Sequence, residues 1–243
     1  MSRIALKIRK LLKILVRPGL AKALLHSGVA GGVEHTVVLS QIEGCHTVVD
    51  IGANRGQFAL AVREILPDTN IFSFEPLPEP AAIFARVFAD DSRARLFQSA
   101  IGTEAGESII HVSGRDDSSS LLPITSRQNQ LFPGTGETGT MTITVGRLSH
   151  YLSETDIPGP ALLKLDVQGY ELQALKGCEE LLHCFEWVYA ECSFVELYEG
   201  QALAPEVIDW LREHGFNLVG KYNVCKDKSG QEIQADILFR RAA

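Results

Sequence analysis

The sequence lacks the features that mark several common protein classes. Its five cysteines are scattered and include no CxxC pair, which argues against a disulfide framework or a zinc site. No stretch is long and apolar enough to span a bilayer. Lysines interrupt the apolar residues near the N-terminus, so we expect no signal-peptide core there. We therefore expect a cytoplasmic protein with reduced thiols.

Acidic residues are absent from the first 33 positions, which contain seven Lys and Arg. The whole chain has 23 basic and 30 acidic side chains, so the remainder carries 16 basic against 30 acidic ones, a formal charge of −14. An acidic body repels the phosphate backbone of nucleic acids. We therefore expect no nucleic-acid partner.

The basic N-terminal stretch has the spacing of an amphipathic helix. Within residues 3–17, lysines and arginines separate five apolar residues at helical intervals: Ile4, Ile8, Leu11, Leu12 and Leu15. We expect residues 1–35 to form a helical extension of a main domain at 36–243. The apolar stripe would pack on that domain or on a second subunit of a homodimer. Peripheral contact with an anionic membrane through residues 3–17 and an organellar targeting role stay open.

After this extension, apolar β-branched stretches alternate with helical patterns, and no internal repeat is visible. Such alternation predicts an α/β fold with a doubly wound, mostly parallel sheet that helices cover on both faces. The last two strands follow each other directly, so they should form an antiparallel hairpin at one edge. The expected strands are 47–53, 70–76, 94–102, 161–169, 185–193, 217–224 and 235–241, and the expected helices are 57–66, 79–89, 170–184 and 205–214.

An insertion at about 106–145 separates the third and fourth expected strands. Two strand-like stretches flank a middle part that is rich in Gly, Ser, Thr and Pro. Loops of this length in compact domains are usually lids, binding loops or disordered segments. We expect residues 116–123 (DDSSSLLP) to fold over a ligand, with hydroxyl groups from Ser118 to Ser120 and with Leu121 and Leu122 excluding water. A merely disordered loop is the alternative.

Carboxylates stand at the ends of four expected strands: Asp50, Glu75, Asp166 and Glu191. In a doubly wound sheet, ligands bind where the carboxyl ends of the strands meet. An acid at the end of an apolar strand is costly unless it faces water or a ligand. The four acids therefore predict a site at this edge.

The first of these strand ends lacks the GxGxxG spacing of a dinucleotide-binding turn. In VVDIGANRGQF, Asn54 holds the position of the middle glycine and Asp50 precedes the turn. An acid there disfavours a phosphate and favours an ammonium group. Glu75, one strand–helix–strand unit later, can accept hydrogen bonds from both hydroxyls of a ribose. An adenosine with an amino-acid tail and no phosphate, namely S-adenosylmethionine, fits both acids.

Several motifs together resemble the FkbM family of S-adenosylmethionine-dependent methyltransferases. They are VVDIGANRGQF, FSFEP, SAIG, LLKLDVQGYELQALKG and YAECSFVELYEGQ, in this order from Thr47 toward the C-terminus. The resemblance implies the seven-stranded class I methyltransferase fold. It also implies methyl transfer to a hydroxyl oxygen, with a sugar, glycan or polyketide-type natural product as the small-molecule or glycan acceptor.

The resemblance also implies roles for single residues. The turn on the methionine side of the cofactor would contain Gly52, Asn54 and Gly56, with Asp50 near the amino group. Glu75 would hold the ribose, and the adenine would lie along Ser99, Ala100 and Ile101.

The reaction itself calls for a group that takes a proton. A protonated alcohol is a poor nucleophile, so a general base, or a metal ion that lowers its pKa, would help. Asp166 is the first candidate for either role and Glu191 the second, and a divalent cation held by both is an open alternative. His150 could reach the mouth of the site but is expected at the surface. The other histidines are expected to be structural or exposed: His26, His35, His46, His111, His183 and His214.

Two other functions compete with methyl transfer. An NAD-dependent oxidoreductase would use the same ribose-binding acid, but the missing GxGxxG counts against it. A non-catalytic S-adenosylmethionine-binding module, recruited by the N-terminal helix, would not need the complete set of acidic strand ends.

Overall fold

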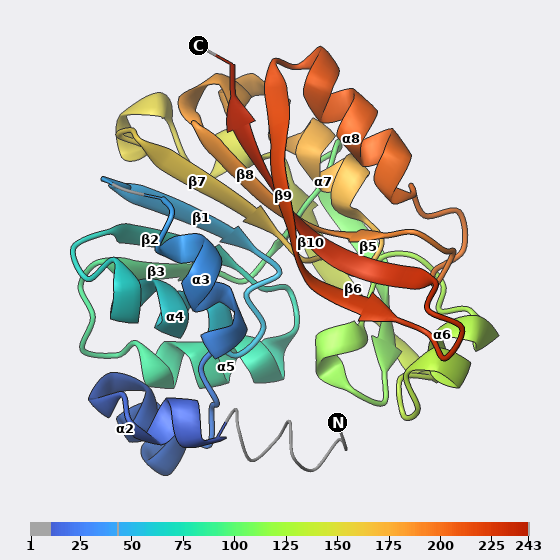
Figure 1. Ribbon diagram of the computed structural model, residues 1–243, viewed down its shortest axis with the longest axis horizontal. Coiled ribbons are helices and arrows are strands. Elements are labelled where there is room, and N and C mark those ends of the chain that lie inside the picture. Colours follow the sequence, from blue (N-terminus) through green and yellow to red (C-terminus); the bar gives the residue numbers. More distant parts are fainter. Residues whose placement is uncertain (1–10, 43, 243) are drawn as a thin grey trace.

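A computed structural model describes residues 11–42 and 44–242. Its main sheet has seven strands in the order β3-β2-β1-β7-β8-β10-β9 (Figure 1). The strands are β1 (Thr47–Ile51), β2 (Asn70–Phe74), β3 (Ala94–Phe97), β7 (Ala161–Leu165), β8 (Trp187–Ser193), β9 (Phe216–Lys226) and β10 (Glu232–Arg241). The predicted α/β fold of the class I methyltransferases is thereby confirmed.

The direction of the strands follows from the way the chain connects them. Strand β1 pairs in parallel with β2 on one side and with β7 on the other. Strand β10 is antiparallel to both β8 and β9, which makes the expected hairpin edge. Every residue of β1 and β7 is buried, because helices cover both faces of the sheet. The strand order reverses between β1 and β7, and ligands bind at such a switch point.

One hydrophobic cluster lies on each face of the sheet. One face carries α2 (Pro18–Ser27), η1 (Val33–His35), α3 (Thr36–Leu39), α4 (Gln57–Ile65) and α5 (Pro78–Val87). The other face carries α7 (Glu171–Gly177), η5 (Glu179–Cys184) and α8 (Ala204–Glu213), with η3 (Leu148–His150) and η4 (Glu154–Asp156) beside them. The segment expected as one helix at 170–184 is therefore α7 followed by a 3₁₀ helix.

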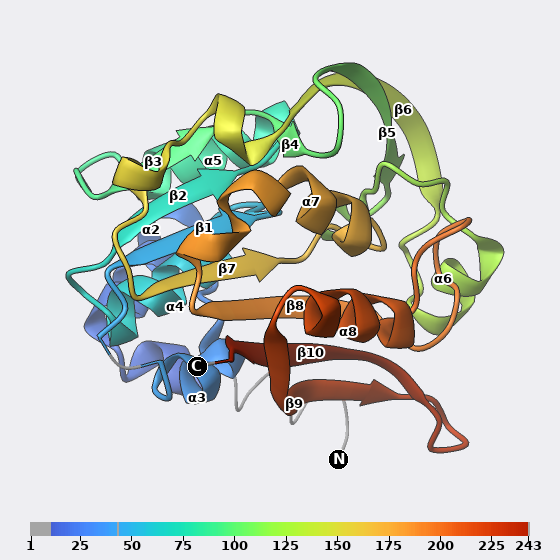
Figure 2. The same cartoon turned by 90° about the horizontal axis from the view of Figure 1, so that it is seen from above.

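The insertion is folded rather than disordered. Strands β5 (Gly106–Ser113) and β6 (Glu137–Gly146) form an antiparallel hairpin, and β4 (Ala100–Ile101) pairs with β6. Between the strands lie η2 (Asp116–Ser118) and α6 (Ser126–Leu131), whose N-terminus Thr125 caps. The hairpin rises from one end of the main sheet in Figure 2 and leads toward α6. The single strand expected at 94–102 is wrong, since β3 and β4 belong to different sheets.

The domain does not cover the described part of the apolar stripe predicted near the N-terminus. Residues 11–15 are helical, and Ile14 is buried in the core, but Leu11, Leu12 and Leu15 are 45%, 58% and 49% exposed. The expected stripe is thus not covered by the domain. Its first two members, Ile4 and Ile8, lie outside the described residues. No helix within 11–42 and 44–242 is long and apolar enough to cross a membrane.

Candidate functional site

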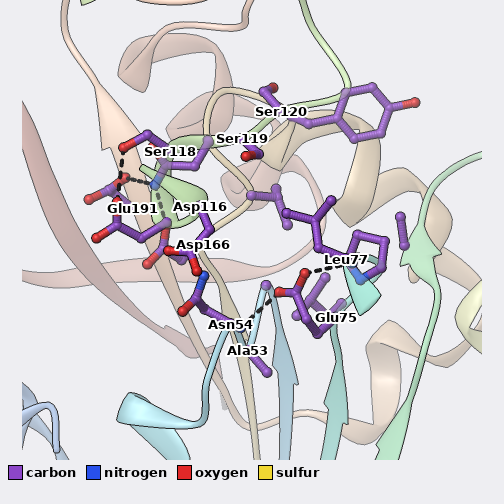
Figure 3. A pocket seen from close by; sticks show the side chains of 18 of the residues that line it. Ala53, Asn54, Glu75, Leu77, Asp116, Ser118, Ser119, Ser120, Asp166 and Glu191 are labelled. Carbon is purple, nitrogen blue, oxygen red and sulfur yellow. Dashed lines mark hydrogen bonds between the residues drawn. The ribbon is translucent and has the colours of Figure 1, made fainter. Parts of the chain in front are cut away.

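A cavity of about 370 Å³ opens at the carboxyl ends of β1, β2 and β7. Figure 3 shows Glu75 and Leu77 at one end of it, Asp166 and Glu191 at the other, and Ser118, Ser119 and Ser120 on a further wall. Five of the eight predicted cofactor residues line this cavity: Gly52, Asn54, Glu75, Ala100 and Ile101. Both predicted catalytic residues, Asp166 and Glu191, line it as well.

The turn after β1 is wedged between the ends of its two neighbouring strands. The N–H groups of Gly52 and Ala53 both donate to the carbonyl oxygen of Phe74, each at 3.0 Å. Gly52 has a φ of +79°, and a Cβ at this position would lie 1.9 Å from the carbonyl oxygen of Asp166. Only glycine fits here, so the bare backbone of the turn can approach a ligand closely.

Glu75 occupies the position that the sequence predicts for a ribose-binding acid. It is 5% exposed, and its two carboxylate oxygens accept the N–H groups of Asn54 and Leu77, both at 2.8 Å. Burial raises its pKa to about 7, although the two N–H groups act in the opposite direction. Each oxygen keeps a lone pair, so the ionised group can accept two further hydrogen bonds from a diol. This arrangement fits the ribose of S-adenosylmethionine.

Asp50 does not line the cavity, in contrast to the expectation that it faces an amino group. The side chain is 0% exposed and contacts the amine of Lys164, its partner on β7, at 2.9 Å. Lys164 also donates to the carbonyl oxygen of Gly52 at 2.9 Å. Burial alone would lower the pKa of Lys164, but Asp50 and Asp166 outweigh burial and raise it. The charged lysine therefore connects Asp50 to the turn.

Two other predicted cofactor residues also lie outside the cavity lining. A side chain at Gly56 would meet the rings of Phe84 and Phe88, so this glycine serves the packing of the turn against α5. Ser99 is 2% exposed, and its hydroxyl lies 2.6 Å from that of Tyr151.

The two predicted catalytic carboxylates are joined by an amide. The Nε2 group of Gln168 donates to Asp166 at 2.6 Å and to Glu191 at 3.0 Å. Gln234 donates to the same oxygen of Glu191 at 3.2 Å. Burial, and after it the charge of Asp166, raises the pKa of Glu191 well above its ordinary value. The neutral form of Glu191 is therefore favoured. The side chain of Asp166 is 36% exposed to solvent.

The bridging amide disfavours the suggested binding of a metal ion between Asp166 and Glu191. The Nε2 group that bridges them is a hydrogen-bond donor and cannot coordinate a cation. Within the described ranges, no cluster of three or more His, Cys, Asp or Glu side chains is arranged to hold a metal ion. His150 is exposed, as expected, and adds nothing to the cavity.

His35 is a cavity residue that the sequence reasoning assigned to structure or surface. Its Nδ1 lies 3.1 Å from the hydroxyl of Tyr189, and that hydroxyl donates to Asp236 at 2.9 Å. The single hydroxyl proton is thus engaged, so Nδ1 must carry the proton of the imidazole and Nε2 keeps its lone pair. Burial lowers the pKa of His35, which favours this neutral form.

The insertion forms one wall of the cavity, and contacts of Asp116 and Ser118 connect it to the rest of the site. Residues 115–121 line the cavity. They include Ser118 to Ser120 and Leu121 of the predicted lid. Arg55, in the turn after β1, forms an ion pair with Asp116. The hydroxyl of Tyr198, which is fully buried, lies 3.1 Å from the carbonyl oxygen of Ser118 and 2.8 Å from Gln168. The lid is therefore connected to both ends of the site.

Comparison with known proteins shows which family this chain resembles. Residues 50–218 match the family model described as a methyltransferase FkbM domain. The chain is 29% identical over 213 residues to 2-O-methyltransferase NoeI of Sinorhizobium fredii, covering 85% of this chain and 84% of that protein. It is 28% identical over 220 residues to 31-O-demethyl-FK506 methyltransferase FkbM of Streptomyces tacrolimicus, covering 81% of each. Methyltransferase sdnD of Sordaria araneosa is 25% identical over 210 residues, covering 76% and 79%.

Proposed function

Because this chain belongs to the FkbM family of S-adenosylmethionine-dependent methyltransferases, we propose that it methylates a hydroxyl oxygen of a sugar, glycan or polyketide-type acceptor. The names of two relatives, a 2-O-methyltransferase and a methyltransferase of 31-O-demethyl-FK506, support oxygen as the acceptor atom. The observation that carries the cofactor assignment is the buried carboxylate of Glu75, held by two backbone N–H groups at the cavity wall.

We propose the following division of the cavity. Glu75 accepts the ribose hydroxyls, the apolar side chains of Leu77, Ala100 and Ile101 contact the adenine, and the turn at Gly52 accommodates the amino-acid tail. Lys164, which also lines the cavity, holds this turn through the carbonyl oxygen of Gly52, and the buried Asp50 holds Lys164. When bound, S-adenosylmethionine supplies an activated methyl group, so alignment of the acceptor is the main task of the protein.

The acceptor hydroxyl also needs a group that takes its proton. Asp166 remains our first candidate because its carboxylate lines the cavity and is partly exposed. The raised pKa of Glu191 makes it a poor base at neutral pH, so we assign it, through Gln168, to the orientation of Asp166. The neutral imidazole of His35 is a second candidate, since Nε2 has the lone pair that a base requires.

An acceptor panel with methyl-labelled S-adenosylmethionine tests the proposal. Sugars, glycans and polyketide-type alcohols are incubated with wild-type protein and with Glu75→Ala, each with and without EDTA. We expect a labelled methyl ether with wild type and little with the variant. Loss of product on EDTA treatment, restored by a divalent cation, would favour the metal alternative. An N- or C-methylated product would overturn the assignment to oxygen.

Two further predictions are part of the proposal. The protein is expected in the cytoplasm, which cell fractionation tests. The second is a homodimer that pairs through a surface other than residues 11–25, which sedimentation at several protein concentrations tests.

A further inference from the structure

Exposed apolar side chains are concentrated in one short segment of the chain. Eleven large apolar side chains are exposed among the described residues, and five of them lie within residues 11–25. They are Leu11, Leu12, Leu15, Val16 and Leu25, with exposed fractions between 45% and 77%. Together with the exposed Lys13 and Lys22 we call them the N-terminal patch.

Helix geometry explains why the domain leaves this patch uncovered. At about 100° per residue, Leu11, Leu12, Leu15 and Val16 occupy one arc of about 140° on the helix. The N–H of Val16 donates to the carbonyl oxygen of Leu12, so the helical geometry extends to Val16. Ile14 points away from the centre of this arc and is 1% exposed. One side of the helix is thus seated in the core while the apolar arc faces outward.

The segment is held firmly in this orientation. Leu20 is 1% exposed and belongs to the same hydrophobic cluster as Ile14. Arg17 lies 3.8 Å from Glu64 of α4, so its charge serves the attachment to the domain. The segment around α2 lies below α4 and α5 in Figure 1, at the outside of the molecule. The apolar arc is therefore a fixed feature of the surface.

The charge around the patch indicates what covers it. Residues 1–33 contain seven basic and no acidic side chains, while the rest of the chain carries −14. If two copies paired through this patch, Lys13 and Lys22 of one copy would face those of the other and repel them. An anionic bilayer offers an apolar interior and negatively charged headgroups at once. It also repels the acidic body, which leaves the basic face as the favoured side for contact.

We propose that the N-terminal patch docks the protein peripherally on anionic lipid bilayers. The apolar arc enters the boundary between headgroups and acyl chains, and Lys13 and Lys22 contact lipid phosphates. After the patch, the chain continues to Gly32, whose N–H donates to the carbonyl oxygen of Gln57 at 2.8 Å, and to His35, which lines the cavity. This proposal does not depend on which acceptor is methylated.

Vesicle flotation of the full-length protein tests the proposal. The vesicles contain either phosphatidylcholine alone or phosphatidylcholine with phosphatidylglycerol. We expect wild type to float with the anionic vesicles, and less so with neutral vesicles or at high salt, because salt screens the lysines. Leu12→Glu combined with Val16→Glu should weaken binding to anionic vesicles about tenfold or more.

A matched variant controls for the loss of apolar surface elsewhere. Leu218→Glu combined with Val219→Glu replaces the same two residue types on β9, where they are 46% and 48% exposed against 58% and 77% for Leu12 and Val16, and should float like wild type. Circular dichroism melting curves establish that both double variants fold. The proposal is overturned if wild type does not float, or if the patch variant floats as well as wild type. A second result also overturns the proposal: sedimentation shows a wild-type dimer that the patch variant dissociates, and flotation shows no vesicle binding.

Discussion

Replacement of Gly52 by alanine should destabilise the protein much more than the same replacement at Gly28. Both glycines have positive φ values, +79° and +69°, so both variants force alanine into a left-handed conformation. This conformation costs about 1–2 kcal/mol for a residue with a Cβ. A Cβ at Gly28 meets nothing within 4 Å, so this is its whole expected cost.

At Gly52 the new methyl group also meets backbone. Its Cβ would stand 1.9 Å from the carbonyl oxygen of Asp166, although real contacts stay above 3.0 Å, so the turn or the end of β7 must move by about 1 Å. Overpacking of this kind adds about 1–3 kcal/mol. We expect Gly28→Ala to lower the free energy of unfolding by about 1 kcal/mol and Gly52→Ala by about 3 kcal/mol.

Urea unfolding followed by circular dichroism measures both values, and calorimetry measures the binding of S-adenosylmethionine. Gly28→Ala should bind the cofactor like wild type, whereas Gly52→Ala should bind it at least tenfold more weakly because the turn has moved. Equal losses of stability in the two variants would refute the close packing of this turn against β7. Wild-type affinity in Gly52→Ala would refute the role of the turn in cofactor binding.

Three further predictions follow from the site. Affinity for S-adenosylmethionine should fall as the pH drops below about 7, the pKa of Glu75, because this carboxylate then takes up a proton and loses acceptor capacity. Calorimetry across pH 5.5–8.5, about three units around this pKa, measures the fall and should show no such slope for Glu75→Ala. Lys164→Met should cost about 3–5 kcal/mol of unfolding free energy because it leaves Asp50 buried and uncompensated, and Asp50→Asn in the same chain should recover part of it in urea titrations. His35→Asn keeps a donor toward Tyr189 but removes the basic nitrogen, so it should lower the methyl-transfer rate and alter its pH profile without changing cofactor affinity; an unchanged rate would remove His35 as a base.

The fold and one end of the site could be predicted because they depend on local patterns. Alternating strands and helices place strand ends at one edge of a sheet, which is how Glu75 and Asp166 come to line the same cavity. Glu75 points into the cavity because two backbone N–H groups hold its carboxylate. One belongs to Asn54 in the turn after β1, and the other to Leu77 at the start of α5.

The errors arise where a side chain meets a partner that is distant in sequence. Asp50 stands at the strand end that the pattern predicts, but it lies directly beside Lys164 in the register of β1 and β7. The buried lysine in LLKLD was the available signal, because a charge inside an apolar strand needs a partner. His35 offered no such signal, since only the tertiary fold brings it from the N-terminal segment to the cavity. The contact of the lid with Tyr198 is equally non-local.

Calorimetric titration of S-adenosylmethionine into wild type and Glu75→Ala measures whether the buried carboxylate binds the cofactor. We predict one binding site per chain in wild type and an affinity about 100-fold lower in the variant, from the loss of two hydrogen bonds to a charged group. NAD, titrated in parallel, should give no saturable heat. Equal affinity of wild type and Glu75→Ala for S-adenosylmethionine, or binding of NAD in its place, would show that Glu75 does not hold the ribose of S-adenosylmethionine.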